Sequence, residues 1–183
     1  MEEEVKDRFE AEVILKKHGI HVAGKPPGEL FMQSARLGLS SIFNYFKKSV
    51  PLDYKNKFND TVFHYAAKGG NSEMVQFLLN NGVSQTPNLF GELPIHYAIE
   101  EGHKNIYEML EESNRLDIKD KFGDTILHLA AREGCEDICK LIIGKRKDLV
   151  NVLNESGQTP LANAMETGSL GVAEIIQKAG GKL

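Results

Sequence analysis

The chain has few of the features that mark membrane, secreted or nucleic-acid-binding proteins. Its 183 residues carry 22 basic and 26 acidic side chains, so no basic excess is present to hold a nucleic-acid backbone. The longest apolar-leaning run without charge, residues 37–46, is about half as long as a membrane-spanning helix requires. The first residues are acidic, whereas a secretory signal starts with basic residues. We therefore predict neither membrane insertion nor nucleic-acid binding.

Cysteine is also scarce, with only Cys135 and Cys139, four positions apart. This pair cannot build a disulfide framework, which indicates a reducing compartment, the cytoplasm or alternatively the nucleus. Apolar residues make up 41% of the chain, enough for a core, so wholesale disorder is not expected. The length favours one domain or one continuous array.

A twelve-residue pattern, by contrast, occurs four times. Its copies follow one another at spacings of 32, 32 and 34 residues and span 59–70, 91–102, 123–134 and 157–168. Self-similarity at such a period is the signature of a repeat protein. Residues 52–58 and 116–122 also match each other two periods apart, which fixes the same register independently.

Each copy predicts a pair of helices. Three copies place a threonine at the helix start, where its hydroxyl can accept a free backbone N–H, and Pro94 and Pro160 occupy the first helical position. A glycine ends each short helix, and a second helix with apolar residues at helical spacing follows. One pair cannot bury that apolar stripe alone, so at least three units must stack.

Thr159-Pro160-Leu161, residues 125–131 and the glycine after each short helix make the chain resemble the ankyrin-repeat family. The resemblance covers residues 28–183 and implies an all-α solenoid of stacked helix-turn-helix units, joined by finger-like β-turns or hairpins. We place the units at residues 28–58, 59–90, 91–122, 123–156 and 157–183. The extra length of the fourth unit is expected in the loop at residues 144–150.

Residues 1–27 are expected to form a degenerate half-repeat that caps the array, followed by a linker. The spacing of Val5, Phe9 and Val13, joined by Ile14, predicts a helix over residues 2–18 with these side chains on its apolar face. Gly19 is expected to end that helix.

Three recurring histidines, His64, His96 and His128, suggest metal or acid–base chemistry at first sight. Equivalent atoms in adjacent units should lie about 10 Å apart, however, which is too far to share one ion. The family resemblance implies instead that each histidine hydrogen-bonds backbone and threonine groups near the start of its helix.

One catalytic or metal-binding alternative stays open, a metal-dependent sensor or enzyme that uses His128, Cys135 and Cys139. No fourth ligand is spaced for a structural site, and Cys139 takes the core position of Val75 two units earlier. We therefore predict no cofactor, no metal and no catalysis. A further alternative is that the chain is the excised repeat domain of a larger protein.

The resemblance implies binding to another protein, as an adaptor or inhibitor that is monomeric in isolation, through the fingers and the inner face of the short helices. Phe58, Phe90 and Phe122 recur once per unit at the fingertips. Either each ring stiffens its finger, or the three form an apolar ridge whose acidic neighbours suit a partner with apolar and basic groups. The expected contact residues are Lys57, Phe58, Asp60, Lys68, Leu89, Phe90, Glu92, Glu100, Glu101, Lys121, Phe122, Asp124, Arg132 and Glu133.

Overall fold

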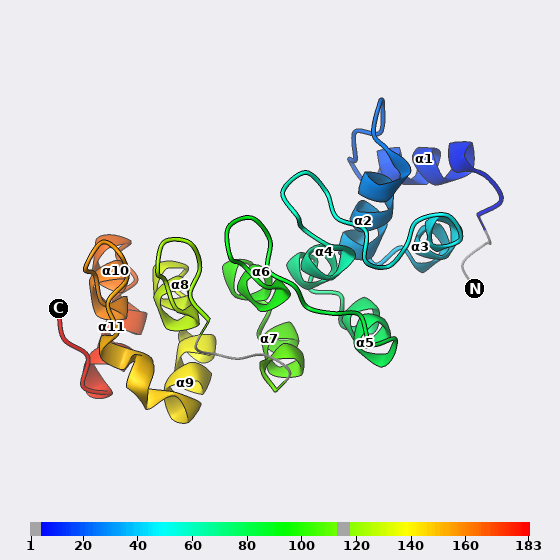
Figure 1. The fold of residues 1–183 in the computed structure, drawn as a ribbon. Helices are drawn as coiled ribbons and strands as arrows, with labels where there is room; N and C mark the ends of the chain where they lie inside the picture. The colour runs from blue at the N-terminus through cyan, green and yellow to red at the C-terminus, as the bar shows by residue number, and fades with distance from the viewer. Residues whose placement is uncertain (1–4, 113–117) are drawn as a thin grey trace.

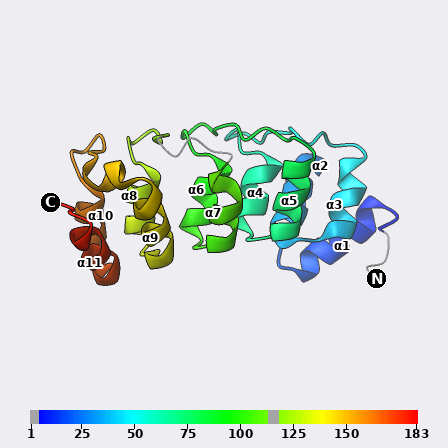
Figure 2. The same cartoon turned by 90° about the horizontal axis from the view of Figure 1, so that it is seen from below.

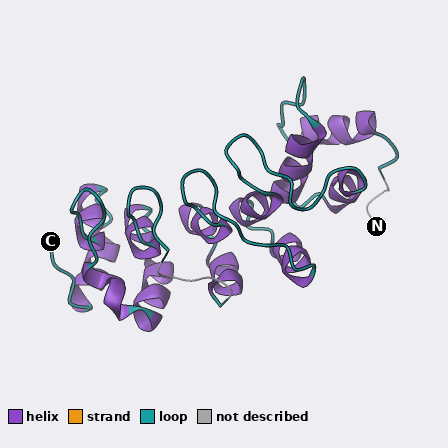
Figure 3. Cartoon of the chain, in the orientation of Figure 1, coloured by secondary structure: helices purple, strands orange, loops and turns teal. Residues whose placement is uncertain are grey.

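A computed structural model describes residues 5–112 and 118–183, and every regular element in these ranges is helical (Figure 3). The α-helices are α1 (Arg8–Lys17), α2 (Pro27–Leu37), α3 (Ser40–Lys47), α4 (Val62–Lys68), α5 (Ser72–Asn80), α6 (Pro94–Glu100), α7 (Lys104–Glu111), α8 (Ile126–Arg132), α9 (Glu136–Lys145), α10 (Pro160–Glu166) and α11 (Leu170–Lys178). The expected all-α, helix-turn-helix array is confirmed.

The helices form two parallel rows. The inner row consists of α2, α4, α6, α8 and α10, and the outer row of α3, α5, α7, α9 and α11 (Figure 1). The loops between units project from the inner row as fingers, and they follow one another along a single edge of the array (Figure 2). The apolar faces of both rows meet in one continuous buried core. None of the helices in the described ranges is long and apolar enough to span a membrane.

The predicted structural role of the histidines is confirmed at two of them. Nδ1 of His64 accepts a hydrogen bond from the Thr61 backbone N–H at 3.0 Å and lies 2.9 Å from the Thr61 hydroxyl. Because Nδ1 accepts, Nε2 carries the proton, and it donates to the Glu92 carbonyl oxygen in the next finger at 3.0 Å. His128 makes the same contacts with Thr125 and the carbonyl oxygen of Gln158. Each ring therefore caps its own helix and holds the next finger.

His96 departs from this arrangement. Leu93 replaces the threonine, so Nδ1 accepts only the Leu93 backbone N–H, at 3.0 Å. Nε2 is buried and has no hydrogen-bond partner among the described residues. Burial lowers the pKa of His96 to about 4, so its ring is neutral at physiological pH. The described residues of the third and fourth units therefore lack the histidine Nε2 hydrogen bond that joins the second unit to the third and the fourth unit to the fifth.

The N-terminal helix differs from its prediction. It begins at Arg8 because the Asp7 carboxylate accepts the backbone N–H of Glu10 at 2.9 Å, so Val5 precedes the helix. The buried face then carries Ala11 and Leu15, whereas Phe9 is 76% exposed and was wrongly assigned to the apolar face. The predicted stop is correct: after Gly19, with φ of 78°, the N–H of Ile20 bonds back to Leu15 at 3.0 Å.

The extra length of the fourth unit lies where the sequence predicts it. Helix α9 ends at Lys145, and a short 3₁₀ helix, η1 (Lys147–Asn151), takes up the additional residues. Leu149 and Val150 in this turn are buried, so the insertion is packed against the array. Lys145 itself pairs with the buried carboxylate of Glu111, which connects α9 to α7.

Candidate protein-binding surface

The four fingers share one turn, built on a residue that the sequence analysis did not single out. In the first finger, Asn56 Oδ1 accepts the backbone N–H groups of Phe58 at 2.8 Å and Asp60 at 3.0 Å. The equivalent side chains in the other fingers do the same and belong to Asn88, Asp120 and Asn154. These residues recur at the repeat period, so the signal was present in the sequence. The turn places a phenylalanine at the tip of the first three fingers.

Backbone hydrogen bonds tie neighbouring fingers into a row. The N–H of Leu89 donates to the Phe58 carbonyl oxygen at 2.9 Å, and the N–H of Lys121 donates to that of Phe90 at 2.8 Å. The N–H of Glu155 donates to the Phe122 carbonyl oxygen at 3.0 Å in the same way. The fingertips therefore have fixed positions relative to one another.

The fingertips present apolar side chains to solvent. Phe58 is 42% exposed, Phe122 57% and Leu89 60%, whereas Phe90 is half-buried. The Phe58 and Phe90 rings lie with their centroids 6.2 Å apart. The predicted column of phenylalanines is thus continuous between the first two fingers.

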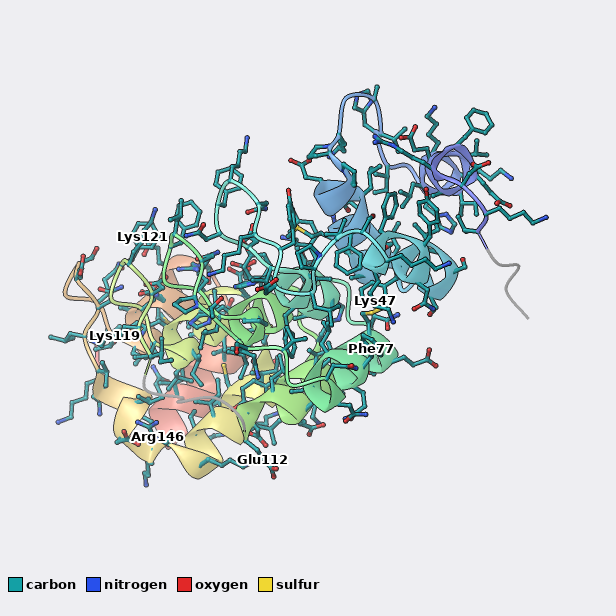
Figure 4. The ribbon with its side chains drawn as sticks, turned by 45° about the vertical axis from the view of Figure 1, so that its right-hand side comes forward. Lys47, Phe77, Glu112, Lys119, Lys121 and Arg146 are labelled. Atoms are coloured by element: carbon teal, nitrogen blue, oxygen red, sulfur yellow. The ribbon has the colours of Figure 1, made fainter. Side chains whose placement is uncertain are left out.

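Lysines cover these rings. Nζ of Lys121 lies 3.8 Å from the centroid of the Phe90 ring and 4.9 Å from that of Phe122, and Nζ of Lys57 lies 4.9 Å from that of Phe58. Figure 4 shows Lys121 at the finger edge, far from Lys47 and Phe77, which form a separate cation–π pair of the outer helices. The ridge formed by the fingertip side chains of Phe58, Leu89, Phe90 and Phe122 is therefore apolar, with the amino groups of Lys57 and Lys121 beside it.

The acidic residues beside the ridge turn inward. Asp60 is 5% exposed and Asp124 is 4% exposed, so neither carboxylate forms the expected acidic rim. Asp60 accepts hydrogen bonds from the side chains of Asn56 at 3.0 Å, Asn88 at 2.9 Å and Tyr97 at 2.9 Å. Asp124 likewise pairs with Asn154 and Arg132. A buried carboxylate must have its oxygens hydrogen-bonded. The bonds that satisfy Asp60 and Asp124 join side chains of adjacent fingers and inner helices, so both acids stabilise the fingers.

A hollow of about 420 Å³ lies between the first two fingers and the inner helices α2, α4 and α6. It brings together four residues of the predicted contact set, Phe58, Asp60, Lys68 and Phe90. Its remaining lining residues were not predicted and are Gln33, Arg36, Tyr65 and Tyr97. Tyr65 and Tyr97 each follow a capping histidine at the repeat period, so this pair could have been found from the sequence.

Hydroxyl groups and one lysine set the polarity of the hollow. Burial, with the neighbouring carboxylate of Asp60, raises the pKa of Tyr97 well above its ordinary value, and burial raises the pKa of Tyr65. Nζ of Lys68 lies 5.2 Å from the centroid of the Tyr97 ring and 3.4 Å from a carboxylate oxygen of Glu101. Both tyrosines are therefore neutral hydroxyls at physiological pH.

The other predicted contact residues on the inner helices lie outside this hollow. Nη1 of Arg132 is 2.7 Å from Asp124 and its Nε is 3.3 Å from Glu133. Glu100 is half-buried, and burial together with the charge of Glu92 raises its pKa. Arg132 is thus engaged with two carboxylates of its own surface.

The side chains of the metal-site alternative are occupied in other ways. Both ring nitrogens of His128 have hydrogen-bond partners. Cys139 is fully buried, which raises the pKa of its thiol to about 12, and the Cys135 thiol donates to the Ile99 carbonyl oxygen at 3.3 Å. In the described ranges, no three His, Cys, Asp or Glu side chains are grouped as metal ligands would be.

Among the described residues, one joint of the array lacks two kinds of side-chain hydrogen bond that are present at two other joints. The amide of Asn88 donates to Asp60 at 2.9 Å and that of Asn154 donates to Asp124 at 2.8 Å. At the equivalent place between the second and third fingers stand Asp120 and Glu92, two carboxylates that cannot form this bond. Together with the unpartnered Nε2 of His96, this leaves the described residues of the third and fourth units without two hydrogen bonds that join the second unit to the third and the fourth to the fifth.

Comparisons with known proteins agree with the repeat architecture. The family model described as ankyrin repeats (3 copies) matches residues 31–120 and again residues 108–182. These matches together extend from within α2 to beyond α11. A search of curated proteins found no match to the chain.

Proposed function

Because this chain belongs to the ankyrin-repeat family, whose repeats generally mediate protein–protein interaction, we propose that it binds a partner protein and has no catalytic role. The contact surface is the finger ridge, formed by Phe58, Leu89, Phe90 and Phe122, together with the adjoining hollow and inner helices. Asp60 and Asp124 are buried beneath this surface, where their hydrogen bonds stabilise the fingers. The protein acts as an adaptor or inhibitor, as a monomer in the cytoplasm or nucleus.

The observation that carries this proposal is the placement of exposed apolar side chains. Eight large apolar side chains of the described residues are exposed, and three of them, Phe58, Leu89 and Phe122, lie on consecutive fingers. Grouped apolar exposure of this kind marks interaction sites, whereas scattered single residues need no explanation. The backbone bonds between fingers also hold these side chains in place before binding, which lowers the entropic cost of association.

The remaining predicted contacts extend the same face. Lys57 and Lys121 flank the ridge, Lys68 lines the hollow, and Glu92 lies at the base of the second finger. Glu100, Glu101, Arg132 and Glu133 continue the surface along α6 and α8. A partner that covers the whole face would contact both groups, and a smaller one only the ridge and hollow.

The test is affinity capture from native lysate with the wild-type chain and with a triple variant, Phe58→Ser, Phe90→Ser and Phe122→Ser. A matched control removes two exposed apolar side chains elsewhere, Phe9→Ser and Leu170→Ser, which are 76% and 69% exposed. We expect proteins that the wild type and the control retain to be lost by the triple variant. Equal capture by all three folded proteins would refute binding through the ridge.

A further inference from the structure

Three side-chain hydrogen bonds join α4 and the first finger to α6 and the second finger. Nε2 of His64 donates to the Glu92 carbonyl oxygen at 3.0 Å. The carboxylate of Asp60 accepts the Asn88 amide and the Tyr97 hydroxyl, each at 2.9 Å. Because these bonds connect both the fingers and the inner helices, they fix the angle between the second and third units.

The equivalent positions between α6 and α8 make none of these three bonds in the part of the chain that the structure describes. Nε2 of His96 has no partner there. Asp120 stands in place of the Asn88 amide and faces the carboxylate position held by Glu92. Leu129 stands in place of Tyr97 and has no hydroxyl to donate.

The packing of the inner helices changes at the same joint. One column of residues occupies the same position in successive inner helices and consists of Ala35, Ala67, Ile99, Ala131 and Met165. Its first four members are fully buried, whereas Met165 in the last unit is 46% exposed, so the column faces the following unit. Ile99 is the large side chain among the four buried members. Since interhelical distance depends on the side chains at the contact, α8 cannot approach α6 as closely as α6 approaches α4.

The turns that follow the inner helices show the same difference. A methyl group placed on Gly70 would lie 2.7 Å from the His103 ring, which is too close for any real contact. One placed on Gly102 would lie 3.8 Å from Cys135 Sγ, an ordinary van der Waals distance. The Cys135 thiol, a weak donor, bonds the Ile99 carbonyl oxygen at 3.3 Å. The turn after α6 is therefore held less closely by the next unit than the turn after α4 is.

Contacts at the edges of this joint remain. In the fingers, the N–H of Lys121 donates to the Phe90 carbonyl oxygen at 2.8 Å. Between the outer helices, Lys145 pairs with Glu111. A single backbone bond and a flexible side-chain pair keep the two units together, but they restrict rotation less than the three bonds of the preceding joint do.

We propose that the contact between α6 and α8 is a hinge, about which α2–α7 and α8–α11 turn as two blocks. Glu100 and Glu101 lie on one side of the hinge, and Arg132 and Glu133 lie on the other. Turning therefore changes the shape of the inner face, while the bonded fingertips keep their spacing. The hinge would fit the proposed contact face to partners of different curvature, but the motion itself does not depend on the proposed function.

Double electron–electron resonance between two spin labels tests the hinge, because it measures the distribution of distances between them. Cys135→Ser and Cys139→Val remove the native thiols. The label pair Glu108→Cys and Glu174→Cys spans the hinge, and the matched pair Asn44→Cys and Glu108→Cys spans the same number of units before it, all at exposed outer-helix positions. We expect a broader distribution for the pair that spans the hinge, and equal widths would overturn the inference.

Two substitutions then assign the motion to the missing bonds. Asp120→Asn supplies a donor to Glu92 and should narrow the distribution of the pair that spans the hinge. Asn88→Asp removes the corresponding bond between the first two fingers, so it should broaden the matched pair and leave the other unchanged. A distribution that Asp120→Asn does not narrow would contradict this origin of the hinge.

Discussion

The side-chain amide of Asn88 donates to the carboxylate of Asp60 at 2.9 Å, so one hydrogen bond joins residues 28 positions apart in adjacent fingers. Asn154 and Asp124 repeat this relationship at 2.8 Å. The second and third fingers carry Asp120 and Glu92 at the equivalent positions, and two carboxylates have no proton to share at neutral pH. The hydrogen bond between fingers is therefore missing at this pair, and a single substitution that introduces an amide donor should supply it.

Asp120→Asn should stabilise the chain by about 1 kcal/mol, because the new amide can donate to Glu92 while its oxygen keeps the turn bonds that Asp120 now accepts. The matched control, Asn88→Asp, removes the existing bond beside buried Asp60 and should destabilise by about 1–3 kcal/mol. Urea unfolding followed by circular dichroism measures both. A loss of stability in Asp120→Asn would contradict the role given to this joint.

His64→Ala should cost more stability than His96→Ala. Both substitutions leave a similar cavity, but only His64 donates from Nε2 to the next finger, at 3.0 Å. We expect the two free energies of unfolding to differ by about 1 kcal/mol, the net value of one hydrogen bond. Equal losses in the same urea experiment would mean that the bond to Glu92 contributes nothing.

Acid should destabilise the chain before its carboxylates titrate. Burial holds the pKa of His96 at about 4 in the folded state, whereas an unfolded histidine has a pKa of about 6.5, so the unfolded chain binds the additional proton as pH falls. His96 therefore contributes a loss of about 2 kcal/mol between pH 7 and pH 5. His64 and His128, whose pKa values burial also lowers, act in the same direction.

The variant His96→Gln isolates this effect, since glutamine does not titrate. The difference in its free energy of unfolding between pH 7 and pH 5 should be smaller than that of the wild type. An identical pH dependence in the two proteins would show that His96 is not a buried neutral histidine.

Gly69→Ala should be strongly destabilising although Gly69 has an ordinary φ of −81°. A methyl group there would overlap the backbone carbonyl of Arg36, forcing α4 away from α2 at a cost of about 1–3 kcal/mol or more. The control is Gly144→Ala in α9, where no heavy atom lies within 4 Å and a gain of about 0.5–1 kcal/mol is expected. Thermal unfolding distinguishes the two; equal midpoints would contradict the close packing of the first two inner helices.

The fold could be predicted from the sequence because its signals are local and recur. A threonine three residues before a histidine marks the starts of α4 and α8, and Pro94 and Pro160 mark the starts of α6 and α10, without reference to distant residues. The inward orientation of the Asp60 side chain could not be predicted, because the side chains that hydrogen-bond its carboxylate, Asn88 and Tyr97, lie 28 and 37 positions away. Phe9 was misplaced for a local reason, because the cap at Asp7 starts the helix later than the apolar spacing indicates.

The hollow was missed because it depends on how units stack. Arg36 belongs to the first unit and Tyr97 to the third, and the packing of α2, α4 and α6 side by side brings both residues to one cavity. The same stacking turned an expected acidic rim into internal support and left the lysines exposed. The prediction of apolar fingertips remains as the basis of the proposed function.

The central claim is tested most directly by measuring the affinity of a captured partner for the wild type and for Phe90→Asp, with the thermal midpoint of both proteins measured in the same buffer. The account predicts that affinity falls by about tenfold or more while the midpoint stays within a few degrees. Unchanged affinity, or loss of folding in Phe90→Asp, would contradict the assignment of this ring to the contact surface.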